Sequence, residues 1–268
     1  MRALLIGDII GRPGRVAIER FIVPLREERA IDVVIANCEN AAGGAGITPS
    51  VADDLFRAGV DVLTSGNHVW KKREAFELLR LDHRILRPAN YPDGAPGTGS
   101  TVVETLTGQK VGVLNVMGRV FMEPIDCPFR VAEQELVRLK LVTPIIVVDM
   151  HAEATSEKVA MGWFLDGKVS CVFGTHTHIP TADERILPQG TGFITDVGMT
   201  GPYDSVIGRR VDQILQRFRS HLPVRSDVAE GNVQLRGLLV DIDAVTGRAT
   251  AVERLTKVLD ERVTGGEP

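Results

Sequence analysis

Four of the six histidines in this sequence lie in three short polar blocks, and each block ends a hydrophobic run of β-strand character. Neutral imidazole is a common ligand of transition metals, so histidines that recur in this setting indicate a metal centre. The sequence places them in the blocks Gly66-Asn67-His68, Met150-His151 and Gly174-Thr175-His176-Thr177-His178.

Two blocks further upstream supply carboxylates and amides in the same setting. Asp8 follows the apolar run of residues 4–6, and Glu39 and Asn40 follow the run of residues 33–36. In an α/β sheet the carboxyl ends of the strands face one crevice, so we expect the five blocks to converge there.

The mixture of ligand types narrows the choice of metal. Carboxylate oxygens combined with imidazole nitrogens suit Mn²⁺, Fe or Zn²⁺ better than Ca²⁺. A carboxylate that bridges two cations holds them about 3.5–4 Å apart, where one hydroxide can attack an in-line phosphorus. Glu39 is the candidate bridge, whereas Cys38 beside it is expected to be a small buried residue and not a thiolate ligand.

Each block also has an ordinary structural explanation. A pair such as Gly7-Asp8 usually forms a turn or a helix cap. His151 could be a hydrogen-bonded core residue, and His176 and His178 could be an alternating surface pair. All five blocks would then carry ligand-type residues at strand ends by accident, so a shared metal centre is the better explanation.

Strand and helix signals alternate along the chain, which predicts an α/β fold with parallel strands and right-handed crossovers. The irregular residues 118–128 interrupt this alternation and are expected to form a lid or a wall of the active site. Strands are expected at residues 3–6, 32–36, 60–64, 101–105, 110–116, 145–148, 169–173, from 191, and at 233–240 and 248–255. Helices are expected at residues 15–28, from 48, and at 72–79, 131–140, 156–165 and 210–219.

Length and composition fit a single domain, which we expect to span residues 1–268 with a loose tail at 264–268. The hydrophobic content of 44% can fill a full core, and no apolar run reaches the length of a membrane span. The net charge of −4 provides no basic field for long nucleic acid. The three cysteines have no C-x-x-C spacing, which fits a reducing cytoplasm.

The ordered set of blocks resembles the motifs of calcineurin-like metallophosphoesterases, and within them it is most similar to the YmdB-like bacterial phosphodiesterases. The resemblance covers nearly the whole chain, including Asn-Val-Met-Gly-Arg at residues 115–119 and Asp-Val-Gly-Met-Thr-Gly-Pro at residues 196–202. One Gly-Asp or Asn-His pair would be weak evidence, but five blocks in order are specific. The resemblance implies a four-layer αββα sandwich.

Two departures from the wider superfamily affect the ligand set. The usual first block is Asp-x-His, but here Ile10 occupies the histidine position and cannot bind a metal. The usual second block supplies an aspartate, whereas here Glu39 is followed by Asn40, whose amide could take the missing place. Both departures occur in the YmdB-like group, so they sharpen the assignment and leave the metal identity open.

Carried over by position, the resemblance implies two metal sites that share Glu39. Metal one would be held by Asp8, Glu39 and His178, assisted by Asn40, and metal two by Glu39, Asn67, His151 and His176. His68 would protonate the leaving oxygen after attack by a metal-bridging hydroxide. Arg119 could contact a phosphate or a base, with a solvated loop arginine as the equal alternative.

The resemblance further implies a phosphodiesterase that acts on 2′,3′- and 3′,5′-cyclic nucleotides, which are small-molecule substrates. Two divalent or mixed-valence transition metal ions per chain are expected, iron or manganese first, with zinc also suitable. No membrane and no stable complex with long nucleic acid is expected, and a homo-oligomer is an open alternative.

Other functions stay open on the sequence alone. A phosphomonoesterase or a nuclease acting on short RNA would use the same metals, although the lack of a basic stripe counts against a nuclease for long polymers. A regulatory nucleotide-binding protein could use the metals for sensing, but it would have no need of the proton donor His68.

Overall fold

Two mixed β-sheets organise residues 1–260, which are the part of the chain that the computed structural model describes. The first sheet has the order β10-β11-β1-β2-β3, with β12 paired to β11, and the second has the order β4-β5-β6-β7-β9-β8. The expected α/β class is confirmed, because strands and helices alternate through most of the chain.

The first sheet carries its parallel strands at the amino-terminal end of the sequence. β1 (Arg2–Ile6), β2 (Val33–Asn37) and β3 (Val62–Thr64) are parallel neighbours. The late strands β10 (Gly201–Pro202), β11 (Val233–Ile242) and β12 (Ala249–Val258) extend this sheet by antiparallel pairing.

The second sheet has a parallel centre with antiparallel edges. β5 (Lys110–Met117), β6 (Ile146–His151), β7 (Cys171–Thr175) and β9 (Gly192–Ile194) run parallel. β4 (Ser100–Glu104) and β8 (Arg185–Ile186) pair antiparallel at the two edges.

Alternating side chains give each sheet two apolar faces. In β1, Leu4 points into a core that contains residues of α1 (Gly11–Arg29), α2 (Pro49–Arg57) and α3 (Ala75–Leu81), whereas Leu5 joins a core shared with the second sheet. In β6, Val147 enters the shared core and Val148 enters a third core. The two sheets therefore pack face to face.

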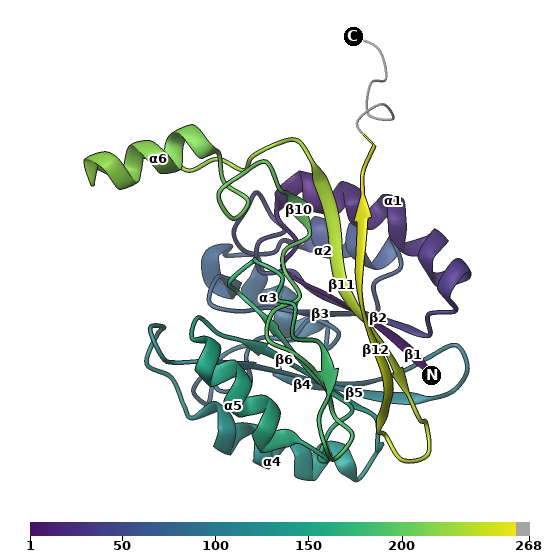
Figure 1. The fold of residues 1–268 in the computed structure, drawn as a ribbon. Coiled ribbons are helices and arrows are strands. Elements are labelled where there is room, and N and C mark those ends of the chain that lie inside the picture. Colours follow the sequence, from purple (N-terminus) through teal and green to yellow (C-terminus); the bar gives the residue numbers. More distant parts are fainter. Residues whose placement is uncertain (261–268) are drawn as a thin grey trace.

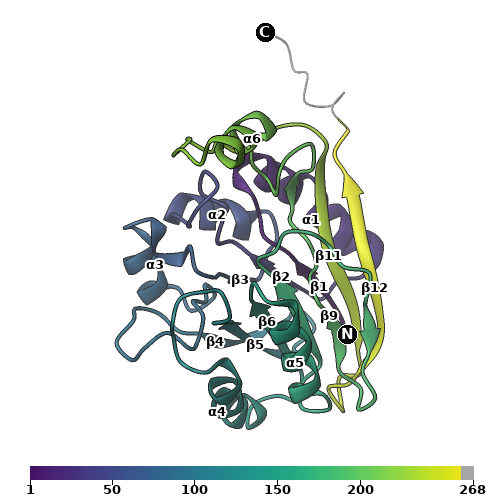
Figure 2. The same cartoon turned by 60° about the vertical axis from the view of Figure 1, so that its left-hand side comes forward.

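The third core covers the outer face of the second sheet with helices. It contains residues of α4 (Pro128–Lys140) and α5 (Thr155–Leu165). These two helices lie at the bottom of Figure 1, with strands between them and α1 and α2. Figure 2 shows α6 (Val211–Ser220) at the opposite end of the molecule from α4 and α5.

The element boundaries differ from the sequence expectation in places with a clear cause. α1 begins at Gly11 and not at residue 15, because backbone N–H groups of a first turn need no intrahelical partner and Pro13 is tolerated there. The helix expected at residues 72–79 begins at Ala75, after a 3₁₀ turn over Val69–Lys71. The two-residue strands β8 and β10 were not expected, since such short pairings have no periodicity to read.

The single domain over residues 1–268 stays a prediction, and the tail predicted at residues 264–268 lies outside the described residues. Within residues 1–260, none of the helices has the length and apolar character that a membrane span requires.

Candidate metal centre

The parallel strands of both sheets end at one region, where they deliver the residues singled out from the sequence. Asp8 follows β1, Glu39 follows β2, and Asn67 follows β3. From the second sheet, His151 is the last residue of β6 and His176 comes directly after β7. The structure brings these side chains together with Asn40 and His178.

One cluster is centred on His151, which is fully buried. Its Nε2 atom lies 3.1 Å from Glu39 Oε2, 3.1 Å from Asn67 Oδ1 and 3.1 Å from His176 Nδ1. The possible ligand atoms of Glu39, His151 and His176 all lie within 4.8 Å of one another. The four side chains expected to hold metal two therefore surround a common point.

A second cluster contains Asp8, Glu39 and His178, whose possible ligand atoms also lie within 4.8 Å of one another. His178 Nε2 is 3.8 Å from Asp8 Oδ1. Asn40 joins this cluster, with its Nδ2 atom 3.1 Å from Glu39 Oε1 and 3.3 Å from His178 Nε2. Glu39 belongs to both clusters, which is the arrangement that a bridging carboxylate needs.

Each of the three imidazoles is held from outside through its other nitrogen. His151 Nδ1 lies 2.9 Å from Thr175 Oγ1, and His178 Nδ1 lies 3.0 Å from the carbonyl oxygen of Ile207. His176 Nε2 lies 3.1 Å from Glu153 Oε2. Outer contacts of this kind fix the ring orientation and leave the inner nitrogen as the ligand atom.

A buried network behind His151 selects its tautomer. Thr175 Oγ1 donates to Asp149 Oδ1 at 2.7 Å, so the hydroxyl oxygen is left to accept the proton of His151 Nδ1. Asp149 also accepts hydrogen bonds from Thr64 Oγ1 at 2.5 Å and Asn37 Nδ2 at 3.0 Å. Burial raises the pKa of Asp149 to about 6. Sequence reasoning missed Asp149, although an aspartate inside an apolar strand was a signal for it.

Among the residues that the structure describes, one carboxylate oxygen of the centre, Asp8 Oδ1, is left without a partner in a way that fits a cation. Asp8 is fully buried, and within the described residues its Oδ1 atom has no hydrogen-bond partner. Burial raises the pKa of Asp8, and the neighbouring Glu39 acts in the same direction. Burial would also raise the pKa of Glu39, but His151 and His68 outweigh burial and lower it. A donor set of buried carboxylates and inward imidazole nitrogens suits transition metals.

Gly66 keeps space open beside this donor set. A Cβ atom built on Gly66 would collide with His151 Nε2 and with Glu39 Oε2. Any larger residue would therefore displace two of the possible ligands, which explains why glycine precedes Asn67 in this block.

His68 lies at the rim of the centre. Its Nδ1 atom is 2.7 Å from Asn40 Oδ1, and its backbone N–H donates to Glu39 Oε2 at 3.1 Å. An amide oxygen only accepts, so Nδ1 carries the proton and Nε2 is the other functional nitrogen. The side chain is 30% exposed, so it is reachable from solvent, unlike His151.

Residues 4–255 match the family model described as YmdB-like protein. The chain belongs to the YmdB-like family. It is 46% identical over 255 residues to a protein of Bacillus subtilis named 2′,3′-cyclic-nucleotide 2′-phosphodiesterase, covering 95% of this chain and 96% of that protein. It is 33% identical to a putative phosphatase/phosphodiesterase of Mycoplasma genitalium, covering 97% of this chain and 94% of the relative.

Solved structures of similar chains share the fold. A hypothetical protein from Thermus thermophilus superposes with a TM-score of 0.90 at 40% identity, covering 96% of this chain and 99% of that one. A structure described as a novel phosphatase of Mycoplasma pneumoniae gives 0.89 at 33% identity, covering 100% and 97%. The expected family and the expected enzyme class, a phosphoesterase, are thereby confirmed.

In this YmdB-like chain, Arg119 lies on a segment that is anchored next to the centre. The Gly118 N–H donates to the carbonyl of His151 at 2.9 Å. The buried carboxylate of Glu157 accepts from the N–H groups of Arg119 at 3.2 Å and Val120 at 3.3 Å. The Arg119 side chain is exposed, so its contact with a substrate stays a prediction, as does the lid formed by residues 118–128.

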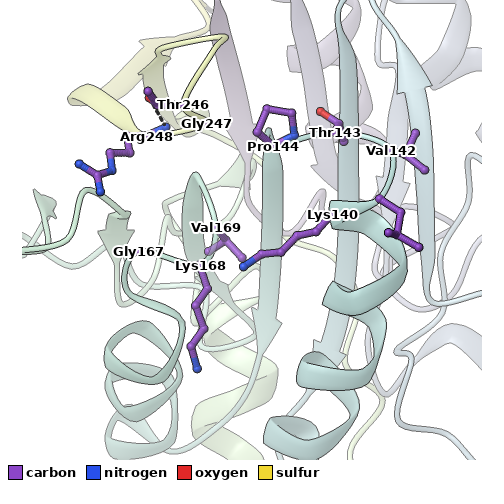
Figure 3. A pocket seen from close by; sticks show the side chains of 11 residues that line it. Lys140, Val142, Thr143, Pro144, Gly167, Lys168, Val169, Thr246, Gly247 and Arg248 are labelled. Carbon is purple, nitrogen blue, oxygen red and sulfur yellow. Dashed lines mark hydrogen bonds between the residues drawn. The ribbon is translucent and has the colours of Figure 1, made fainter.

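A cavity of about 390 Å³ lies away from the centre. Its lining residues include Pro144 and Val169, which precede β6 and β7, so it lies at the amino ends of the strands whose carboxyl ends carry the histidines. Figure 3 shows two of its basic side chains, Lys168 and Arg248, extending in different directions. Within the described residues, those proposed from the sequence for the metal centre do not line this cavity.

Replacing Gly66 by alanine is expected to weaken metal binding, because the new methyl group must displace His151 or Glu39. Overpacking of this kind costs about 1–3 kcal/mol of stability, and the displaced ligands lose their common point. Calorimetric titration of the chelated protein with Mn²⁺ measures the affinity. Gly112→Ala is the matched control, because a Cβ atom there meets its nearest neighbours at 3.4 Å. Normal Mn²⁺ affinity in Gly66→Ala would contradict the proposed packing.

Proposed function

We propose that this chain is a dinuclear metal-dependent phosphodiesterase that hydrolyses cyclic nucleotides. The observation that carries the proposal is the pair of clusters that share Glu39, in which three imidazoles direct one nitrogen inward and hold the other outward. Such a pair of sites is the arrangement used for in-line displacement at phosphorus.

The proposed ligand sets follow the two clusters. Asp8, Glu39 and His178 would hold one cation with assistance from Asn40, and Glu39, Asn67, His151 and His176 would hold the other. Bound there, the cations would neutralise the charge on the phosphoryl oxygens and lower the pKa of a water molecule.

Side chains of the protein would then position the substrate and protonate its leaving oxygen. Asn40 Oδ1 accepts the proton of His68 Nδ1, which fixes the ring, and in the doubly protonated imidazolium form His68 Nε2 would give its proton to the departing ribose oxygen. Burial lowers the pKa of His68, while Glu39 opposes this shift. Arg119 is the proposed contact for the phosphate or the base, since Glu157 fixes its backbone beside His151.

The proposed substrates are 2′,3′- and 3′,5′-cyclic nucleotides. The name of the Bacillus subtilis relative supports the 2′,3′-linked class for this chain. We further propose that the fold is a four-layer αββα sandwich, because cores lie between the sheets and between each sheet and its helices. Iron or manganese is the proposed metal, with zinc as the alternative, and the proposed location is the cytoplasm.

Metal analysis combined with a turnover screen tests this function. The screen compares cyclic nucleotides with phosphomonoesters and short RNA, each before and after chelation. We expect two metal ions per chain and the highest kcat/KM on cyclic nucleotides. Preferred turnover of phosphomonoesters or RNA would replace the proposed substrate class, and turnover that survives complete chelation would remove the metal centre from the mechanism.

Glu39→Gln is expected to weaken both sites at once, because it removes the one carboxylate that both clusters share. Loss of an outer partner alone costs 10- to 100-fold in metal affinity, so this change should exceed about 100-fold and abolish hydrolysis. Plasma emission analysis gives the stoichiometry, and circular dichroism shows whether the fold persists. Glu104→Gln, on an exposed position of β4, is the control. Two tightly bound metals in a folded Glu39→Gln protein would disprove the shared ligand.

His68→Ala is expected to keep both metals and to lose activity in proportion to how poor the leaving group is. Without a proton donor, cyclic nucleotide turnover should fall by about 10²- to 10⁴-fold, whereas a nitrophenyl phosphodiester leaves as a stable anion and should be affected far less. His83→Ala, at an exposed position, is the control. Equal losses on both substrates would assign His68 to substrate binding, and loss of metal would make it a ligand.

A further inference from the structure

The segment of residues 196–200 connects the ligand-bearing loops of the two sheets through backbone hydrogen bonds. Met199 N–H donates to the carbonyl of His178 at 3.0 Å, and Thr200 N–H donates to the carbonyl of Asp8 at 2.9 Å. The carbonyl of Thr200 in turn accepts from Ile10 N–H at 2.9 Å. This segment therefore connects the loop of Asp8 to the loop of His178, in addition to the direct hydrogen bond from His176 N–H to Asp8 Oδ2 at 3.0 Å.

Asp196 begins this segment and uses both carboxylate oxygens. Its Oδ1 atom accepts from Gly198 N–H at 2.7 Å. Its Oδ2 atom accepts from Lys158 Nζ at 2.7 Å and from Thr177 Oγ1 at 2.6 Å. Lys158 Nζ also donates to Thr177 Oγ1 at 2.9 Å, so the three side chains form a closed triangle. Asp196 is fully buried and Lys158 is 1% exposed.

The triangle holds the residue that separates two proposed ligands. His176 and His178 both have positive φ angles, 91° and 66°, which are unfavourable for residues with a side chain. Thr177 lies between them and bonds to Asp196 through its hydroxyl and its backbone N–H. A strained loop of this kind persists only where its surroundings hold it, and here the triangle provides that hold.

A purely stabilising role explains the triangle poorly. Burying a charged pair costs desolvation, and well-packed apolar residues at such places are often equally or more stable. The two charges are also aimed at Thr177 and not only at each other. A charged pair directed at a loop residue fits a requirement for position better than a requirement for stability.

We propose that Lys158, Asp196 and Thr177 form a clamp that positions His178, and with it the Asp8–Glu39–His178 centre, for metal binding. These are positioning residues, since none of them belongs to either ligand cluster. This role for the three residues depends on the proposed metal centre. It also gives a role to the Asp-Val-Gly-Met-Thr sequence at residues 196–200.

Thr177→Val tests the clamp, because valine keeps the shape of threonine and removes only the hydroxyl that Lys158 and Asp196 share. Titration of the chelated protein with Mn²⁺ should show one of two sites weakened by about 10- to 100-fold, the range for loss of an outer partner. The visible absorption of the Co²⁺-loaded protein should change for the same site. Thr177→Ser restores a hydroxyl and should return both the affinity and the spectrum toward those of the wild type.

Thr191→Val is the matched control, because it is the same substitution at a fully buried threonine whose hydroxyl donates to the carbonyl of Val169 at 2.8 Å, outside the clamp. It should bind two Mn²⁺ ions normally. Wild-type affinity and spectrum in Thr177→Val would overturn the clamp while leaving the metal centre intact. A failure of Thr177→Ser to rescue would also overturn it. Wild-type protein that binds fewer than two ions would instead overturn the proposed centre and the clamp together.

Discussion

Two buried carboxylates close to one another impose the constraint on which the rest of the site depends. Asp8 and Glu39 are at most 1% exposed, and like charges in a poorly solvated place require positive charge nearby. Among the protein's own groups, the need for nearby positive charge affects the histidines differently, and their pKa values shift in opposite directions. Burial would lower the pKa of His151, but Glu39 raises it to about 9, whereas burial and His151 together lower the pKa of His176 to about 3. The hydrogen bonds around the carboxylates and histidines keep these charged groups in one place.

The two-sheet architecture satisfies the constraint because both sheets end their parallel strands at the same place. Adjacent strands in register supply adjacent loops, as with Met117 opposite His151 and His151 opposite Thr175. The segments that follow β1 and β9 approach closely at a glycine, since a Cβ atom on Gly7 would collide with the carbonyl of Gly198. Packing between the sheets and the hydrogen bonds of residues 196–200 together determine how near the carboxylates come to the imidazoles.

The sequence predicted most of the fold and the chemical types at the site, because both depend on local patterns. Asp8, Glu39 and His151 could be found since each ends an apolar run, and their meeting follows from the parallel arrangement of strands. The outer partners could not be found in this way. Thr175 and Glu153 are defined by the side chain that each touches across the fold, and residue type does not encode that contact, whereas Asp149 had a signal in its place inside an apolar strand. The extent of α1 was also misjudged, because its glycines and prolines look like a loop while the helix geometry tolerates them.

The hydrogen bond from His176 N–H to Asp8 Oδ2 joins residues that are 168 positions apart in the sequence. A cation held by residues of both sheets would close the same long loop and would therefore behave as a reversible cross-link. A cation that binds the folded chain and not the unfolded one stabilises the folded state by mass action, and this stabilisation rises with the concentration of free metal. Metal supply would then control resistance to unfolding and proteolysis as well as catalysis. In a cell short of metal, the chain would be removed along with its activity.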